Sequence, residues 1–285
     1  MTEPGHRPAA DSAADAAAAA RTRLDRALDH LDVTFRGMTA RADETQCDCH
    51  WGSPEELALL KVPGTDLDPD LLHRAWRAPD WSDHAAVLRR VLPQFARELT
   101  GGLGAYAYDI DNVGDSFHRA DWQQWPAPQS AAVREFLHAW WAHTLLTPDP
   151  AVPAHALLPL CSQASGTLGP WLAVWEATEG AVPDHHLART LDAWTGELLM
   201  GFLPWTTGGL TWEEEVAVHE ELTAWFVRQA PARLRAHDAS EELLDEVHLL
   251  GLPGPVRVED PRWQPFRRRR EAAAAAARER LRLHP

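Results

Sequence analysis

A short cluster of cysteine and histidine is the part of this sequence best suited to chemistry. Cys47, Cys49 and His50 lie within four consecutive positions. Thiolate and imidazole are the ligands that zinc prefers, and a structural zinc ion binds four of them in a tetrahedron. The cluster predicts three of these ligands, so we expect a structural zinc ion as the cofactor. Because Cys-x-Cys is a tighter spacing than most zinc sites use, ordinary thiols beside a polar histidine are the alternative interpretation.

A fourth zinc ligand has to come from another part of the chain. The candidates are Cys161, His84 and His73. A redox-active or nucleophilic thiol is a third interpretation of the cluster, and it requires a lowered thiol pKa. Acidic neighbours raise that pKa instead, and three of them lie close in sequence: Asp43, Glu44 and Asp48.

Pairs of carboxylate and histidine suggest a second kind of metal chemistry. Glu135 and His138 have the Glu-x-x-His spacing of di-iron bundles and lie in a long amphipathic stretch. A metal-dependent enzyme that uses Glu, Asp and His from several helices, including His219, is therefore an alternative hypothesis. Pairs at this spacing also stabilise a helix directly. The sequence contains no phosphate-binding loop with its lysine, no Gly-x-Ser-x-Gly elbow and no His-Glu-x-x-His motif, which favours a protein that is not an enzyme.

Four consecutive arginines near the C-terminus form the strongest basic feature: Arg267, Arg268, Arg269 and Arg270. The chain as a whole carries 27 Lys and Arg against 42 Asp and Glu, a net charge of −15. An acidic body of this kind repels nucleic acid and anionic membranes. The arginine run has three interpretations: a solvated tail, a segment docked on the acidic body of its own or another copy, or a contact for nucleic acid or anionic lipid.

Tryptophan is unusually abundant, with 14 in 285 residues. Several fall at apolar helical positions: Trp76, Trp122, Trp140, Trp171, Trp194 and Trp225. Because an indole buries a large area and needs one partner for its N–H, we expect most of them in the core. Tryptophan is also enriched at binding hot spots, so some of these side chains could line a groove for a peptide or ligand.

Helical periodicity accounts for nearly the whole chain. An apolar residue recurs every four or three positions near the N-terminus, which predicts a helix with a heptad seam made of Leu24, Leu28, Leu31, Phe35 and Met38. This helix packs on its own domain or pairs with a partner in a short coiled coil. Further helical stretches follow, joined by turns with Pro and Gly. The predicted fold class is all-α, with antiparallel helix pairs in a compact or solenoid-like domain and a basic C-terminal tail helix.

Local signals mark individual elements. Ser53 with Glu56, and Thr211 with Glu214, predict capping boxes at two helix starts. Pro93 is expected to kink or split the helix that contains it. Residues 104–110 alternate weakly between apolar and polar side chains and are the best strand candidate.

Composition divides the chain into three parts: residues 1–44 with a disordered start and an amphipathic helix, 45–260 as a helical domain, and 261–285 as an Arg-rich tail. No stretch reaches the ~18 apolar residues that span a bilayer, and the N-terminus lacks the regions of a signal peptide. The three cysteines are an odd number and cannot all pair within the chain. We therefore expect a cytoplasmic protein with reduced thiols. A single lysine, Lys61, and abundant alanine are typical of a high-GC bacterial genome.

Three motifs resemble a family of bacterial helical proteins. They are Cys47-Asp-Cys-His-Trp-Gly, Leu92-Pro93-Gln94-Phe95, and Trp125-Pro126 followed by the segment from Phe136 to Trp141. The similarity runs from about Cys47 to Trp263. The family has a short Cys/His cluster and no established activity, so the resemblance implies a shared helical fold and transfers no function. Its pattern often reads Cys-x-His-Cys, where this chain has Cys-x-Cys-His.

The leading hypothesis is a non-enzymatic interaction or scaffold protein with a structural zinc site, whose partner is another protein or a second copy of the chain. Nucleic acid or a membrane would contact it only through the Arg-rich tail. The alternatives are the metal-dependent enzyme and a nucleic-acid-associated or membrane-associated regulator that acts through that tail.

Overall fold

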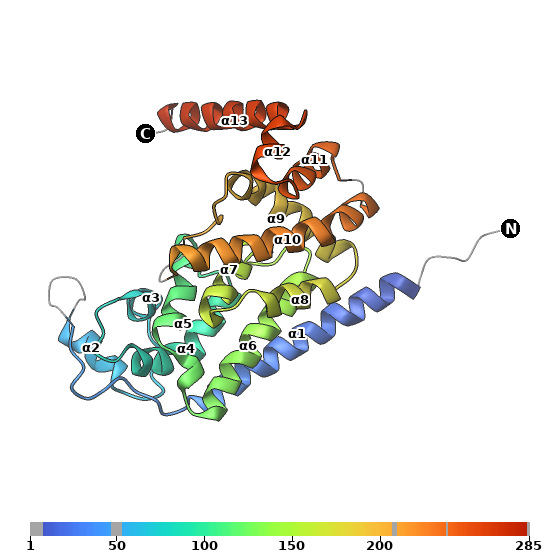
Figure 1. Cartoon of the computed structure of the whole chain (residues 1–285). Helices are drawn as coiled ribbons and strands as arrows, with labels where there is room; N and C mark the ends of the chain where they lie inside the picture. Colours follow the sequence, from blue (N-terminus) through green and yellow to red (C-terminus); the bar gives the residue numbers. More distant parts are fainter. Residues whose placement is uncertain (1–7, 47–52, 207–209, 238, 284–285) are drawn as a thin grey trace. The chain divides into compact units, whose positions relative to one another are not determined.

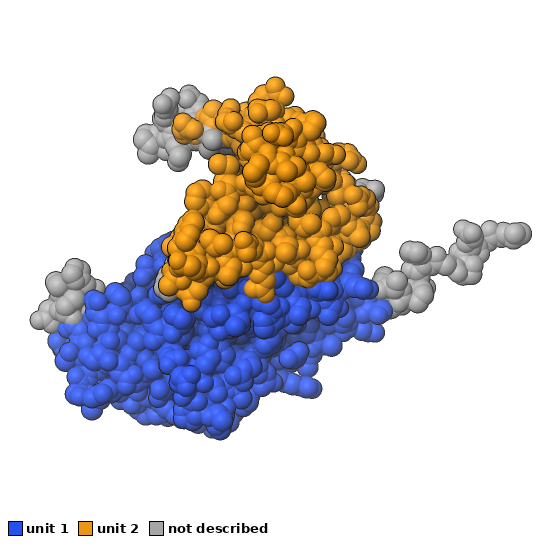
Figure 2. Space-filling view, viewed as in Figure 1, with its two compact units in different colours: residues 1–182 blue, residues 183–285 orange. Residues whose placement is uncertain are grey.

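The fold is all-α, as the sequence predicts. A computed structural model describes residues 8–46, 53–206, 210–237 and 239–283 of the chain. Within these ranges the regular structure consists of thirteen α-helices and two 3-10 helices, with no strand (Figure 1). The chain divides into two compact units, residues 1–182 and residues 183–285 (Figure 2). The composition boundaries at 44/45 and 260/261 fall inside these units, and the division near residue 182 has no counterpart in the sequence analysis.

The first unit contains eight α-helices and both 3-10 helices within its described residues. Their bounds are α1 Pro8–Thr34, α2 Pro54–Leu60, α3 Pro69–Arg77, α4 His84–Thr100, η1 Gly104–Asn112, α5 Val113–Arg119, η2 Trp122–Gln124, α6 Ala127–Leu146, α7 Ala154–Ser165 and α8 Gly169–Ala177. The second unit begins within α9, Ala181–Leu199, and continues with α10 Trp212–Ala236, α11 Glu241–Leu250, α12 Gly254–Glu259 and α13 Trp263–Leu283.

The heptad seam of α1 packs against α6 in the same unit. Four of its five apolar side chains, Leu24, Leu28, Leu31 and Phe35, are buried. His30 Nδ1 lies 2.9 Å from Glu135 Oε2, whereas Arg21 and Asp25 act electrostatically on His143 further along α6. Residue 30 of α1 is therefore near residue 135 of α6, and residues 21 and 25 are near residue 143. Because residue numbers decrease along α1 as they increase along α6, the two helices run antiparallel. The sequence left two arrangements open for this helix, packing on its own domain or a coiled coil with a partner. In the structure it packs on its own unit.

The predicted caps at α2 and α10 are confirmed. Ser53 Oγ accepts from the Glu56 backbone N–H, and Glu56 accepts from the Ser53 N–H. Thr211 and Glu214 form the same reciprocal pair at α10. Such pairs satisfy two of the backbone N–H groups that a helix start leaves without partners.

Tryptophans fill much of the core of the first unit. Trp76, Trp141 and Trp175 are among the largest fully buried side chains. Trp141 and Trp175 meet edge to face with ring centroids 5.4 Å apart. Buried indole N–H groups donate to main-chain oxygens, as Trp141 Nε1 does to the Trp171 carbonyl at 3.0 Å. The expectation that most tryptophans belong to the core is confirmed, since all six named from the sequence are buried: Trp76, Trp122, Trp140, Trp171, Trp194 and Trp225.

The strand expected over residues 104–110 is wrong, because this segment forms the 3-10 helix η1. The backbone enters it through a left-handed turn, with φ of 84° at Gly102, 60° at Leu103 and 52° at Gly104. Two positive φ values on glycine are cheap, but leucine rarely adopts one. A 3-10 helix has three residues per turn, so Tyr106 and Asp109 lie on one face of η1, against α3.

Two further features concern helix continuity and close packing. Pro93 lies inside α4, which continues through it, so the expected split does not occur.

Gly114 allows α5 to approach α7, because a Cβ at this position would lie 2.7 Å from Gln163 Cβ. None of the described helices combines the length and hydropathy that a bilayer crossing needs.

Candidate functional site

The three predicted zinc ligands, Cys47, Cys49 and His50, lie outside the described residues. The zinc site therefore stays a prediction. Across the described ranges, no three His, Cys, Asp or Glu side chains gather in a way that could hold a metal ion.

The three candidates for a fourth ligand have separate surroundings. Cys161 is fully buried in α7, and burial raises the pKa of its thiol. His84 is buried at the start of α4, where its Nε2 donates to the Ser116 carbonyl at 3.0 Å. Burial lowers the pKa of His84 to about 4, so this imidazole is neutral at pH 7. His73 lies on α3, and its Nε2 is 2.5 Å from Asp109 Oδ2.

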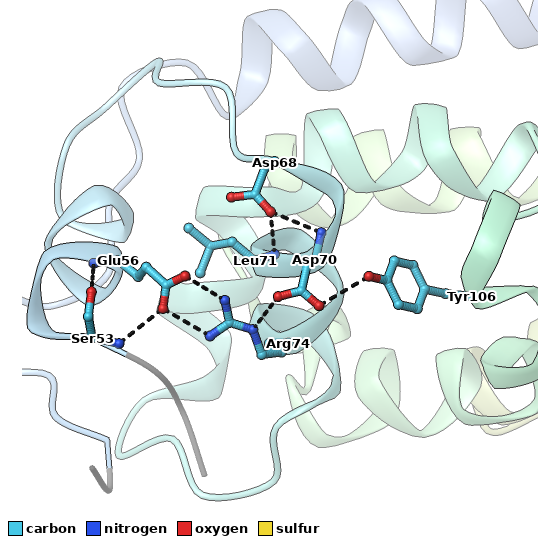
Figure 3. A network of polar contacts seen from close by, with 7 residues as sticks. All are labelled: Ser53, Glu56, Asp68, Asp70, Leu71, Arg74 and Tyr106. Atoms are coloured by element: carbon cyan, nitrogen blue, oxygen red, sulfur yellow. Dashed lines mark hydrogen bonds and ion pairs between the residues drawn. The ribbon is translucent and has the colours of Figure 1, made fainter. Parts of the chain in front are cut away.

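A polar network around Arg74 joins α2, α3 and η1 (Figure 3). The guanidinium makes two hydrogen bonds to Glu56, at 2.8 and 3.2 Å, and one to Asp70 at 2.9 Å. Tyr106 Oη donates to Asp70 at 3.1 Å. The hydrogen bond from Arg74 lowers the pKa of Glu56. One guanidinium faces two carboxylates, so the network keeps a net negative charge, and its hydrogen bonds hold three elements together.

His73 and Asp109 form a second contact from α3 to η1. Asp109 Oδ1 also accepts from Asn112 Nδ2 at 2.9 Å and from Arg77 Nε at 3.4 Å. The His73 ring stacks on Tyr106, with centroids 4.0 Å apart. The carboxylate fixes the orientation of the imidazole, as second-sphere carboxylates do for metal-binding or proton-transferring histidines.

A cavity of about 200 Å³ lies beside this pair. It is lined by Gln46, His73, Arg74, Arg77, Ala78, Pro79 and Asp80. Gln46 is the last described residue before the segment that carries the predicted zinc ligands. Of the three candidates for a fourth ligand, His73 is the one that lines this cavity.

A tryptophan-lined cavity of about 290 Å³ lies between η2, α6 and the α7–α8 connection. We call it the tryptophan cavity, and its lining residues are Trp122, Gln123, Arg134, Leu137, His138, Ser165, Thr167, Pro170 and Trp171. Its walls are held by hydrogen bonds to the end of α7. Trp122 Nε1 and Gln123 Nε2 both donate to the Ala164 carbonyl, at 2.6 and 3.2 Å, and Trp171 Nε1 donates to Ser165 Oγ at 2.9 Å. These bonds fix the indoles before any ligand arrives.

The charge in the tryptophan cavity is positive. The guanidinium of Arg134 lies 5.7 Å from the centroid of the Trp122 ring, and Arg134 has no ion pair with a described residue. His138 stacks on Trp171 with centroids 4.4 Å apart. Burial, then Arg23 and Arg134, lower the pKa of His138, so its imidazole is neutral at pH 7. The described residues of the lining include one permanent cation and no carboxylate, although the whole chain is strongly acidic.

The described part of the arginine run lies on α13 and contacts acidic side chains of the second unit. Arg269 pairs with Glu246 at 3.0 Å, and Arg270 pairs with Glu197 at 3.1 Å. Arg267 pairs with Glu271 one turn along α13, and Arg268 is exposed. A Cβ at Gly196 would collide with the guanidinium of Arg270, which therefore lies directly against the backbone of α9.

The residues named for a metal-dependent enzyme have separate partners. Glu135 pairs with His30, and His138 belongs to the tryptophan cavity. His219 Nε2 donates to the Leu198 carbonyl at 2.9 Å in the second unit. None of these contacts joins one of the three residues to another.

Comparison with known proteins adds no relative: no family model, no curated protein and no solved structure matches this chain. The resemblance to a family of bacterial helical proteins therefore stays a prediction.

Sequence reasoning singled out three residues of the tryptophan cavity, Trp122, His138 and Trp171, without placing them together. It missed Arg134, Ser165 and Thr167. The cavity is assembled from residues 122–123, 134–138 and 165–171. An arginine at an exposed helical position carries no signal in the sequence, so only the packing of these segments identifies it.

Proposed function

We propose that this chain is a non-enzymatic binding protein, and that the tryptophan cavity takes up a small ligand with a flat apolar body and a carboxylate. The observation that carries this proposal is the described lining, with two fixed indoles and with Arg134, which pairs with no described carboxylate, but with no acidic side chain among its described residues. Small-molecule sites are typically concave and apolar with a few placed polar groups. The cavity has this composition.

The roles of the individual residues follow from their chemistry. Arg134 would pair with the ligand carboxylate, since a guanidinium matches two carboxylate oxygens at once. Neutral His138 would contact the ligand without repelling or attracting its charge. The hydroxyl of Thr167, which is exposed at the cavity, supplies a further donor. Pro170, which is exposed at the cavity, would cover the apolar body.

Calorimetric titration of the full chain tests the proposal. Benzoate, phenylacetate and indole-3-acetate serve as probes, and benzamide is the uncharged comparison. We expect saturable binding of at least one acid and weaker binding of benzamide. Arg134→Gln should weaken binding of the acid by about tenfold or more, because a charge-assisted pair is lost.

Arg189→Gln is the matched control, because Arg189 is exposed on α9 and does not line the cavity. Its affinity should equal that of the unaltered protein. If none of the acids binds, or if Arg134→Gln and Arg189→Gln bind them equally well, the proposal fails.

The structural zinc ion is a separate proposal that concerns Cys47, Cys49 and His50. It agrees with an interaction protein, because a structural metal would stabilise the fold without catalysing a reaction. Its test is described in the Discussion.

A further inference from the structure

A third cavity in the first unit, of about 340 Å³, lies where the end of α1, the loop after α2 and α4 meet. Its lining carries three arginines and two aspartates, Arg36, Arg90, Arg97, Asp32 and Asp66. Both signs of charge therefore line one cavity that is open to solvent. We call this the mixed-charge cavity.

Arg90 is the most informative residue of the mixed-charge cavity. It is only 7% exposed. Its guanidinium donates to the carbonyls of Val62 at 3.1 Å and Thr65 at 2.5 Å, and among the described residues it has no hydrogen bond to a carboxylate. A buried charge normally has a counter-ion, because its desolvation is costly. Asp66 acts on Arg90 electrostatically but does not contact it through a hydrogen bond.

Of the other four charged side chains in the lining, Arg97 and Asp32 pair with each other, whereas Arg36 and Asp66 are available to a ligand. Arg97 bonds to Asp32 and to Asp29 across the α1–α4 contact, so these side chains are occupied. Arg36 is exposed and makes no ion pair with a described residue. Asp66 is exposed as well. The cavity thus offers Arg36 and Arg90 to an anionic group and Asp66 to a cationic one.

The walls of the mixed-charge cavity are fixed in advance. The Gln94 side chain bonds the backbone of Leu67 twice, as acceptor from its N–H at 3.0 Å and as donor to its carbonyl at 2.6 Å. Arg90 holds the neighbouring part of the same loop. Phe35, Met38 and Pro93 supply an apolar part of the lining. A preformed site loses little free energy to ordering when a ligand binds.

We infer that the mixed-charge cavity binds a small zwitterion, a free α-amino acid with an apolar side chain. Its carboxylate would meet Arg90 and Arg36, which supplies the missing counter-ion. Its ammonium group would meet Asp66, and its side chain would lie against Phe35, Met38 and Pro93. This site is distinct from the tryptophan cavity and shares no lining residue with it.

Titration calorimetry of the full chain with leucine and two derivatives tests this inference. Leucinamide lacks the carboxylate, and N-acetylleucine lacks the ammonium group. We expect leucine to bind, and each derivative to bind about tenfold more weakly or less, because each loses one charged contact. Glycine should also bind more weakly than leucine, since it leaves the apolar lining uncovered.

Two exposed residues provide the variants, so that folding is preserved. Arg36→Gln should weaken leucine but leave leucinamide unchanged, and Asp66→Asn should weaken leucine but leave N-acetylleucine unchanged. Arg26→Gln is the control, because Arg26 is exposed on α1 and outside the cavity. Absence of saturable leucine binding overturns the inference, as does N-acetylleucine binding as tightly as leucine, which would indicate a simple anion site.

Discussion

His84 is a single residue that makes the stability of the fold depend on pH. The folded protein holds its pKa at about 4, chiefly through burial and then through Arg119, whereas an unfolded histidine has a pKa near 6.5. The unfolded chain therefore takes up a proton at a pH where the folded chain does not. The contribution of His84 is fully present above pH 6.5 and is lost as the pH falls towards 4.

We expect this residue to remove about 2 kcal/mol of unfolding free energy between pH 7 and pH 5. Urea unfolding at both values measures the loss. His84→Gln keeps a donor near the Ser116 carbonyl but does not titrate. The unfolding free energy that this variant loses between pH 7 and pH 5 should therefore be about 2 kcal/mol smaller than that of the unaltered protein. His185→Gln, at an exposed position of α9, should behave like the unaltered protein. Equal pH dependence in all three proteins would contradict the assignment.

Cys47 provides the residue-scale test of zinc binding. If Cys47, Cys49 and His50 hold a structural ion, the purified full chain should contain about one zinc per molecule, and Cys47→Ser should lower that content strongly. Elemental analysis by plasma mass spectrometry measures it. Cys161→Ala separates two models: unchanged zinc excludes Cys161 as the fourth ligand, as its enclosed position in α7 suggests. A zinc content near zero in the unaltered chain would end the proposal.

At the scale of elements, the α1–α6 contact is where a core substitution should cost most. Leu31 is completely buried in this contact. Leu31→Ala removes apolar contacts and leaves a cavity, which typically costs roughly 2–5 kcal/mol. Val33 lies two residues away on the same helix and is 64% exposed, so Val33→Ala should cost less than about 0.5 kcal/mol.

Thermal and urea unfolding of both variants compare these costs, and sedimentation checks the state of assembly. If α1 instead formed a coiled coil between copies, Leu31→Ala would dissociate an oligomer and the midpoint would depend on protein concentration. A concentration-independent midpoint is the expected result.

Sequence patterns predict elements well where the signal is local. The capping boxes at Ser53 and Thr211 and the seam from Leu24 to Phe35 depend on residues a few positions apart, and each appears as predicted. The segment 104–110 fails because its conformation is set from outside, by the left-handed turn at Leu103 and by contacts of Tyr106 and Asp109 with α3. The tryptophan cavity and the mixed-charge cavity could not be predicted from the sequence for a related reason. Each is lined by three segments that are distant in the sequence.

For the whole molecule, the uneven distribution of charge sets what can bind. The body is acidic, and two cations of the arginine run, Arg269 and Arg270, already face Glu246 and Glu197. The Arg270–Glu197 pair is exposed and contributes little to stability, whereas the Glu246 carboxylate of the other pair is largely buried. They nevertheless place carboxylates beside the cations that would have to contact phosphate.

Salt-dependent binding to nucleic acid therefore tests the tail as a site for phosphate contact. Removing residues 262–285 would also remove Trp263 and Phe266, which are buried, so it would confuse folding with binding. The pair of substitutions Arg267→Gln and Arg268→Gln changes charge without touching that core. A protein that neutralises several phosphates loses affinity steeply with salt, with a slope of about −0.9 per phosphate on logarithmic axes. Three of the four arginines face glutamates, and in the described part of the chain only Arg267 and Arg268 are not paired with another helix. We therefore expect a slope no steeper than about −2, and the double substitution should abolish it. A steeper slope that survives the double substitution would place the phosphate contacts elsewhere on the chain, and with them the function that the sequence had suggested for its tail.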